Sequence, residues 1–307
     1  MRLLSLEEKF KKIDPSLCTV TQVEDALNKV NLGVAQMLGE TMYLRENNFH
    51  APKWHGMETI EETVSLYAEM GAFEGIDPAL VSFVELLYRC HDIGRLFEDC
   101  MIMTRNNAIG VPVVYANHGR AVVHLVLSRF AVSMVLGAEA QQIFDYAISH
   151  HHDRFLPELP AGASDIDRTA DFFARFLRDL DMMGGLLRKT ESWMNDPEKK
   201  KNEMAQYGIG EEIGSIIPVS ALADFTDFKP IDTETIKNGG SWEAYMLCHL
   251  AWVINISFDK TVEILARAGI FAKYLAYFKA RLPRKEYIVI RNTLRQYLNE
   301  RGVWYGF

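Results

Sequence analysis

Apolar residues recur along most of this chain at spacings of three and four, which predicts helices and not strands. The clearest case begins at Thr21, where Thr21 and Glu24 match a capping box. Its apolar positions are Val23, Leu27, Val30, Val34 and Leu38. Because the sequence Asn47-Asn48-Phe49-His50-Ala51-Pro52 interrupts the pattern, we expect a long helix over about residues 20–46.

The same spacing continues through most of the remaining chain. Asp77 before Pro78 predicts an N-cap, and Gly184-Gly185 predicts a helix end. The expected helices cover about residues 55–70, 78–91, 118–136, 138–152, 164–184, 241–256, 259–280 and 284–301. Residues 190–240 are polar, and the helical spacing of apolar residues is interrupted there. No stretch alternates convincingly with period two, so we expect an all-α fold.

Composition narrows the class of protein further. Hydrophobic residues make up 49% of the 307 residues and charged residues 24%, which is typical of a soluble globular protein with a large core. The net charge of −8 weighs against a long nucleic-acid footprint. The longest apolar run, residues 121–138, contains His124 and Arg129, so we interpret it as a buried helix and expect no membrane span. The N-terminus turns charged too early for a signal peptide, and the four cysteines form no CxxC pair, which favours the cytoplasm.

A His91-Asp92 pair stands where the predicted helix over residues 78–91 ends, and Gly94 follows it. An imidazole and a carboxylate side by side can both ligate a divalent metal. Further histidines lie at or near the ends of other predicted helices, as a metal site inside a helical bundle requires. They are His55, His118, His151 and His152.

Two aspartates inside the helix predicted over residues 164–184 require a choice between them. The apolar stripe of this helix comprises Phe173, Phe176, Leu177, Leu180 and Gly184. Asp181 lies at spacings of four and three from Leu177 and Gly184, so we expect it to face the core, whereas Asp179 points elsewhere. A core-facing carboxylate is costly unless it binds a cation or is well hydrogen-bonded, so Asp181 is the predicted acidic ligand.

This order of residues resembles the HD superfamily of metal-dependent phosphohydrolases. The resemblance covers about residues 50–190 and rests on His55, on His91-Asp92 before Ile93-Gly94, and on Asp181. His118 and the string from His150 to Arg154 resemble the subset with two-metal sites. Arg154-Phe155-Leu156-Pro157 stands where the cyclic-dinucleotide branch has a Gly-Tyr-Pro signature, so the resemblance does not extend to that branch.

The resemblance implies an HD-type helical bundle that holds two divalent ions. Asp92 would bridge the ions, with His55 and His91 on one, His118 and His151 on the other, and Asp181 completing the ligand set. The resemblance does not determine which divalent metal binds, and Fe, Mn, Ni, Co, Mg and Zn are all candidates. The expected catalytic residues are Asp92, His118, His152 and Arg95. Arg95, Arg120 and Arg154 are candidates for holding a phosphate through paired hydrogen bonds.

The other histidines and the cysteine beside the motif have less specific interpretations. We expect His124 to pack in the interior, His150 to face solvent and His50 to lie in a loop. His249 is expected to be a satisfied core histidine, and Cys90 a packed thiol without a reactive role.

The implied domains are an N-terminal helical extension (1–46), the HD core (47–190) and a C-terminal helical region packed on the core (191–307). The C-terminal helices are also a candidate homodimer face. The first functional hypothesis is hydrolysis of a phosphate ester of a nucleotide or another small phosphorylated metabolite. The alternatives are a mixed-valent di-iron oxygenase of HD fold and a nucleotide-binding regulatory module.

Overall fold

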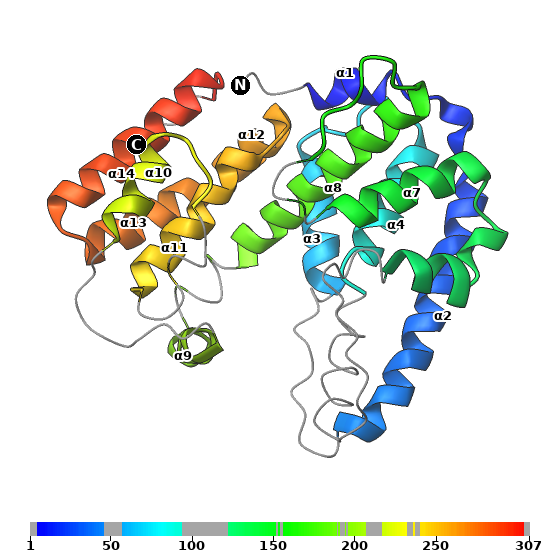
Figure 1. The fold of residues 1–307 in the computed structure, drawn as a ribbon, viewed down its shortest axis with the longest axis horizontal. Coiled ribbons are helices and arrows are strands. Elements are labelled where there is room, and N and C mark those ends of the chain that lie inside the picture. Colours follow the sequence, from blue (N-terminus) through cyan, green and yellow to red (C-terminus); the bar gives the residue numbers. More distant parts are fainter. Residues whose placement is uncertain are drawn as a thin grey trace. The chain divides into compact units, whose positions relative to one another are not determined.

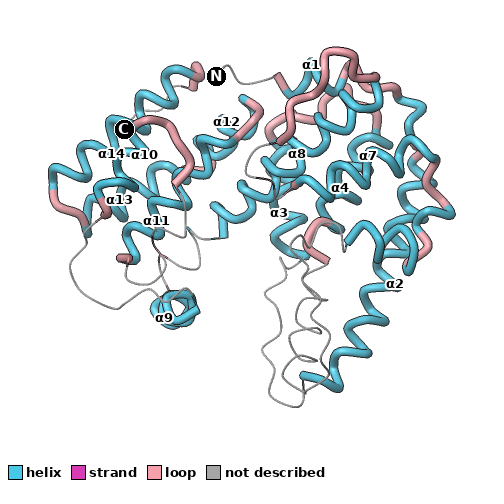
Figure 2. The backbone as a smooth tube through the Cα atoms, in the orientation of Figure 1, coloured by secondary structure: helices cyan, strands magenta, loops and turns pink. Residues whose placement is uncertain are grey.

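The protein folds as helices joined by turns and loops. The computed structural model describes residues 5–45, 57–93, 122–151, 153, 156–188, 190, 194, 196–206, 217–231, 236 and 240–303. Over these ranges it contains no β-strand, which confirms the predicted all-α fold (Figure 2). The chain divides into two compact units, one over Glu7–Leu180 and the other over Asp181–Phe307 with the first six residues.

The first unit is built around α4 (Pro78–Cys90), which Figure 1 labels. Most residues of α4 are buried. Asp77 caps this helix as predicted, since its side chain accepts a hydrogen bond from Ala79 N at 2.8 Å. The helices α2 (Val20–Arg45), α3 (Met57–Glu69) and α7 (Ala138–His150) pack against α4. The helix α8 (Asp165–Arg188) also reaches α4, because the rings of Phe83 and Phe173 meet edge to face at 5.2 Å. The short helices are α1 (Leu6–Phe10), η1 (Pro15–Leu17), η2 (Leu125–Arg129) and η3 (Val132–Met134).

A cluster of aromatic rings forms the interior of this unit. Phe10 of α1 contacts several rings edge to face, the closest being Phe172 of α8 at 4.9 Å. Tyr67 of α3 meets Phe176 of α8 at 5.2 Å in the same geometry. Such pairs add to the free energy of burial and fix the rotation of each ring. The aromatic cluster therefore helps to fix α1, α3 and α8 relative to one another.

The predicted start of α2 near residue 20 is confirmed, but its predicted capping box and the predicted ends of two other helices are wrong, each for a local reason. The capping box of α2 joins Thr19 and Gln22 and not Thr21 and Glu24, with Gln22 N donating to Thr19 Oγ1 and Thr19 N donating to Gln22 Oε1. The helix predicted to run to residue 136 ends in the π-helical turn η2, because Ala131 takes a left-handed conformation at φ 55°. The helix α8, whose last residues belong to the second unit, runs through Gly184-Gly185. A Cβ at Gly185 would lie 2.7 Å from the Trp252 ring, so this glycine permits close packing and does not end the helix.

Replacing Gly33 with alanine is expected to lower the free energy of unfolding by about 1–3 kcal/mol. Gly33 lies inside α2, where alanine is normally the better helix former. Here a Cβ would overlap the Phe130 ring, so the clash outweighs the gain in helix propensity. Denaturant unfolding of the Gly33→Ala and Gly162→Ala variants tests this, because a Cβ at Gly162 meets nothing within 4 Å. Equal stability of the two variants would contradict the packing described for Phe130.

The second unit is also helical throughout its described residues. Its helices are α9 (Pro197–Gln206), α10 (Val219–Thr226), α11 (Trp242–Leu250), η6 (Ala251–Asn255), α12 (Asp259–Arg267), α13 (Ile270–Arg281) and α14 (Arg284–Glu300). The predicted helix over residues 259–280 is interrupted at Gly269, whose φ of +72° is the left-handed conformation that glycine favours. Within the unit, α14 packs against α10 and α13. The predicted domain boundaries, and the packing of this region on the core, stay predictions.

His249 is the core histidine that the sequence predicts. It is buried, its Nδ1 donates to the Tyr245 carbonyl at 2.9 Å, and its ring lies edge to face against Tyr245 and Trp252.

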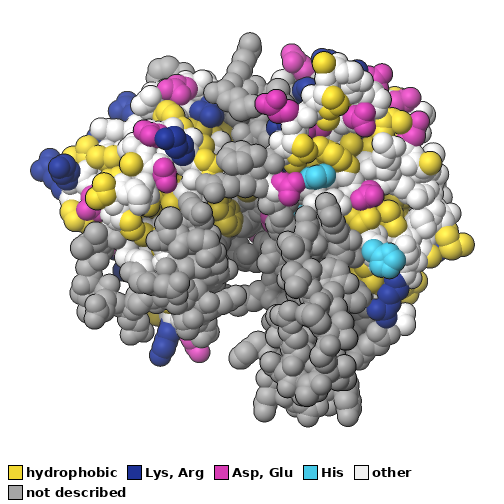
Figure 3. Space-filling view, in the orientation of Figure 1, with side chains coloured by type: hydrophobic (Ala, Val, Ile, Leu, Met, Phe, Trp, Pro, Cys, Tyr) yellow, Lys and Arg dark blue, Asp and Glu magenta, His cyan; other side chains and the backbone are white. Residues whose placement is uncertain are grey.

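The surface carries charges of both signs, mixed among the described residues on the face drawn in Figure 3. Among the helices that the structure describes, none is both long and apolar enough to cross a membrane.

Candidate metal site

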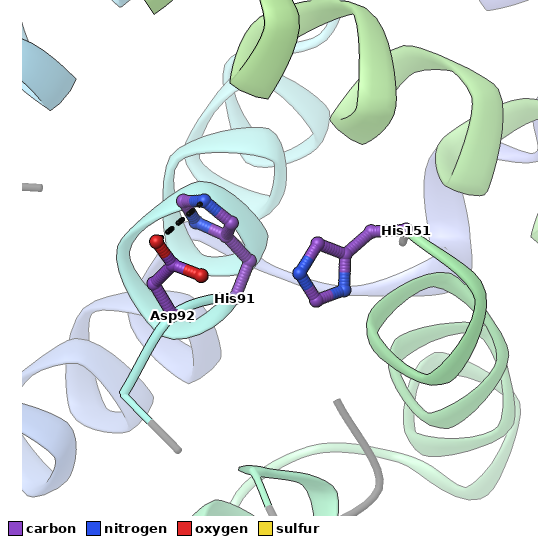
Figure 4. Close-up of side chains that lie close together, drawn as sticks. All are labelled: His91, Asp92 and His151. Carbon is purple, nitrogen blue, oxygen red and sulfur yellow. Dashed lines mark ion pairs between the residues drawn. The ribbon is translucent and has the colours of Figure 1, made fainter. Parts of the chain in front are cut away.

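Three potential metal ligands meet in the interior of the first unit. His91, Asp92 and His151 each offer a ligand atom, and these atoms lie within 4.8 Å of one another (Figure 4). The exposed fractions of the three residues are 0%, 1% and 1%. Figure 4 shows the His151 ring pointing toward the other two side chains. We call these residues the HDH cluster.

The HDH cluster forms where two helices end side by side. His91 is the C-cap of α4, and His151 is the C-cap of α7. Because α4 and α7 pack against each other, their C-terminal ends deliver the two imidazoles to one place. The C-terminus of a helix carries partial negative charge, so two such ends favour a cation between them. Asp92, one residue beyond the end of α4, adds a carboxylate.

Both histidines are held in the same local arrangement. His91 Nδ1 lies 2.6 Å from the carbonyl oxygen of Tyr88, and His151 Nδ1 lies 2.6 Å from that of Ile148. A carbonyl oxygen can only accept a hydrogen bond, so Nδ1 carries the proton in each ring. In the neutral imidazole the lone pair is then on Nε2. Metal-binding histidines in proteins are oriented in this way by a backbone carbonyl behind the ring.

The separation of the His91 and Asp92 ligand atoms suits two ligands of one ion. His91 Nε2 and Asp92 Oδ2 are 3.7 Å apart, which is longer than a hydrogen bond. Two ligand atoms at about 2.0–2.2 Å from a metal are at most ~4.4 Å apart. The rings of His91 and His151 are nearly perpendicular, with centroids 5.2 Å apart. Two imidazoles and one carboxylate fit Zn²⁺, Mn²⁺, Fe²⁺, Co²⁺ or Ni²⁺ better than Ca²⁺, which takes six to eight oxygen ligands.

The structure thus brings together three of the ligands that the sequence predicts. Asp181 is not a member of the HDH cluster, and it belongs to the other compact unit. Its role as a ligand stays a prediction. The remaining predicted site residues lie outside the described residues. These are His55, Arg95, His118, Arg120, His152 and Arg154.

The expected orientation of the two α8 aspartates is wrong. Asp179 is fully buried at 0% exposure, whereas Asp181 is partly exposed. The predicted stripe of Phe173, Phe176, Leu177 and Leu180 is buried. However, nearly every residue of α8 beyond Phe176 is buried as well, so the interior covers far more than one face. A residue two positions from the stripe therefore also lies inside.

The predictions for the other histidines and the cysteine near the HDH cluster are confirmed in part. Cys90 is buried as predicted, and burial raises the pKa of its thiol. His150 is partly exposed, with Nδ1 2.5 Å from Asp153 Oδ2. The predicted packing of His124 is wrong because the residue is exposed, at the point where the π-helical turn η2 changes the helical register.

One residue that sequence reasoning did not single out contacts the HDH cluster directly. Tyr88 stacks on the His91 ring with centroids 5.0 Å apart and an interplanar angle of 26°. In the sequence Tyr88 is one more large residue of an apolar helix, so only its position three residues before His91 could have marked it.

No protein-family model, curated protein or solved structure matches this chain. The geometry of the HDH cluster is therefore the main indication of the protein's function. Catalytic metal sites typically combine three protein ligands with a position for water or a substrate atom, and the described residues contribute three candidate ligands. A structural site closes its coordination shell with protein atoms instead.

Proposed function

We propose that this chain is a metal-dependent phosphohydrolase of the HD type. Its substrate would be a phosphate ester of a nucleotide or of another small phosphorylated metabolite. One observation carries the proposal: two buried histidines, each at a helix C-terminus and each with Nδ1–H donated to a carbonyl, converge with Asp92. The consecutive His-Asp pair at the end of a central helix supports the HD assignment.

Each residue of the HDH cluster has a definite role in this proposal. His91 and His151 present Nε2 lone pairs without rearranging, because the carbonyls of Tyr88 and Ile148 hold the rings. Asp92 provides a negative charge that partly offsets that of the cation and raises affinity for a divalent ion. A bound divalent ion lowers the pKa of a water ligand and neutralises charge on a phosphoryl oxygen.

The residues taken from the HD resemblance would complete the site. His55, His118 and Asp181 would contribute to a two-ion centre with Asp92 as the bridge. Arg95, Arg120 and Arg154 would hold the phosphate by paired hydrogen bonds. His152 would contact the substrate or support a ligand. The roles of these residues go beyond the HDH cluster, and each role is tested by substituting that residue separately.

The proposal is tested with purified full-length protein that has been loaded separately with Mn²⁺, Co²⁺, Ni²⁺ or Fe²⁺. Each form is incubated with a panel of nucleotides, sugar phosphates and other phosphomonoesters, and phosphate release is measured. Hydrolysis of at least one panel member by the loaded protein, and none by the metal-free protein, is the expected result. No hydrolysis by protein with a demonstrably filled site would reject the phosphohydrolase.

The two alternative functions, a di-iron oxygenase and a nucleotide-binding regulatory module, predict different results with the same metal-loaded protein. Two histidines and one carboxylate also suit non-haem iron, so the iron-loaded protein is examined for oxygen chemistry. An EPR signal of coupled Fe(II)/Fe(III) with oxygen uptake on a polyol or phosphonate would assign an oxygenase. Nucleotide binding in calorimetry without turnover would assign a regulatory module.

A further inference from the structure

Tyr88 contacts the metal-binding histidine in two ways. Its backbone carbonyl accepts the hydrogen bond from His91 Nδ1 at 2.6 Å. Its ring stacks on the His91 imidazole, with centroids 5.0 Å apart. The carbonyl fixes which nitrogen carries the proton, and the stacked ring restricts the tilt of the imidazole plane. Together they determine where Nε2 of His91 points.

The Tyr88 hydroxyl contacts two other helices. It lies 3.2 Å from the carbonyl oxygen of Leu180 in α8 and 3.4 Å from Thr63 Oγ1 in α3. Because the carbonyl only accepts, the single Tyr88 proton is donated to Leu180, and the Thr63 hydroxyl can donate to the Tyr88 oxygen. Tyr88 and Thr63 are both fully buried, so these hydrogen bonds do not compete with bulk water. One side chain thus joins α3, α4 and α8 directly behind His91.

We propose that Tyr88 is a positioning residue of the HDH cluster, acting through its hydroxyl. A phenol ring can hold the neighbouring imidazole only if its own tilt is fixed, and the bonds to Leu180 and Thr63 fix it. Leu180 also precedes Asp181, the predicted acidic ligand, so the same hydroxyl restrains the α8 backbone beside that residue. The inference rests on the proposed metal binding at His91.

A purely structural hydroxyl would behave differently from a positioning one. Loss of a buried hydrogen bond lowers the stability of the fold wherever it occurs. Only a positioning role also changes metal affinity and ligand geometry. Tyr297 provides a matched control, since it is buried and its hydroxyl donates to the Val253 carbonyl in the other unit. The substitution Tyr297→Phe therefore removes the same kind of bond far from His91 in sequence.

The experiment is a titration of the full-length chain with Co²⁺, followed by ligand-field absorption and by calorimetry. Tyr88→Phe keeps the ring and the backbone carbonyl, and is expected to raise the Kd for Co²⁺ by roughly tenfold and to shift the absorption bands. Thr63→Val removes the hydroxyl that Tyr88 contacts in α3 while keeping the shape of the side chain, and is expected to change the Kd for Co²⁺ in the same direction by less. Tyr297→Phe is expected to lower the Tm and to leave both the Kd and the spectrum unchanged.

The results separate failure of this inference from failure of the metal site. If the wild type binds Co²⁺ and Tyr88→Phe matches it in Kd and spectrum, Tyr88 is structural only and the inference is overturned. A change of the same size in Tyr297→Phe would also overturn it, because the effect would then follow stability alone. If the wild type shows no Co²⁺ binding, the metal site itself is rejected, and the inference with it.

Discussion

The Asp92→Asn variant is expected to lose phosphoester hydrolysis, with kcat/KM falling more than about a hundredfold. Even residues that only orient a metal ligand cost 10–100-fold when replaced, and Asp92 is proposed to bind the ion directly. Asparagine keeps the size of the side chain but loses the charge and one ligand oxygen. The measurement is steady-state hydrolysis of the best substrate from the phosphoester panel, at saturating metal.

Asp145→Asn is the matched control for this prediction. Asp145 is an exposed carboxylate of α7, the helix that delivers His151, and it accepts a hydrogen bond from Ser149. This variant makes the same chemical change on the protein surface and is expected to retain wild-type kcat/KM. Retention of full activity by Asp92→Asn would remove Asp92 from the mechanism.

Removal of the metal is expected to lower the Tm of the wild-type protein by on the order of 10 °C. A ligand that binds only the folded state stabilises it by about 3–4 kcal/mol when its free concentration is 100–1,000 times the Kd. Each kcal/mol corresponds to roughly 2–4 °C for a chain segment of this size. The Asp92 carboxylate is only 1% exposed, so its burial costs free energy. Removal of the cation also removes the attraction that offsets this cost.

The measurement compares thermal unfolding of the wild type and Asp92→Asn, with and without a chelator and with metal added back. The chelator should lower the Tm of the wild type, metal should restore it, and Asp92→Asn should respond to neither. An equal response of the two proteins would place the stabilising ion elsewhere in the chain.

Local sequence signals predicted the element that carries the motif. The N-cap Asp77, Pro78 after it and the apolar spacing through Leu87 define α4, and they place His91 at its C-terminal end. All of this information lies within one helix of the chain. The proximity of His151 has a different origin, since it depends on the packing of α7 against α4. The sequence order suggested that proximity through the HD resemblance, and no local pattern contains it.

The errors arose where tertiary packing determines the outcome. A helical stripe assumes one buried face, but α8 is buried on most sides beyond Phe176, so Asp179 is inside although it lies off the stripe. Gly184-Gly185 resembles a helix end, yet Gly185 lies where the Trp252 ring leaves no space for a Cβ. Tyr88 appeared to be an ordinary core residue, because hydrogen bonds to Thr63 and Leu180 leave no mark in the sequence.

The metal content of the protein, purified without chelator, tests the central claim most directly. Elemental analysis of the wild type is expected to find at least one transition-metal ion per chain, and Asp92→Asn and His91→Ala are expected to contain almost none. The same comparison after reloading with Co²⁺ removes any dependence on the metal supply during expression. A wild-type protein that remains free of metal after reloading, or variants that bind as much as the wild type, would contradict a metal centre at His91, Asp92 and His151.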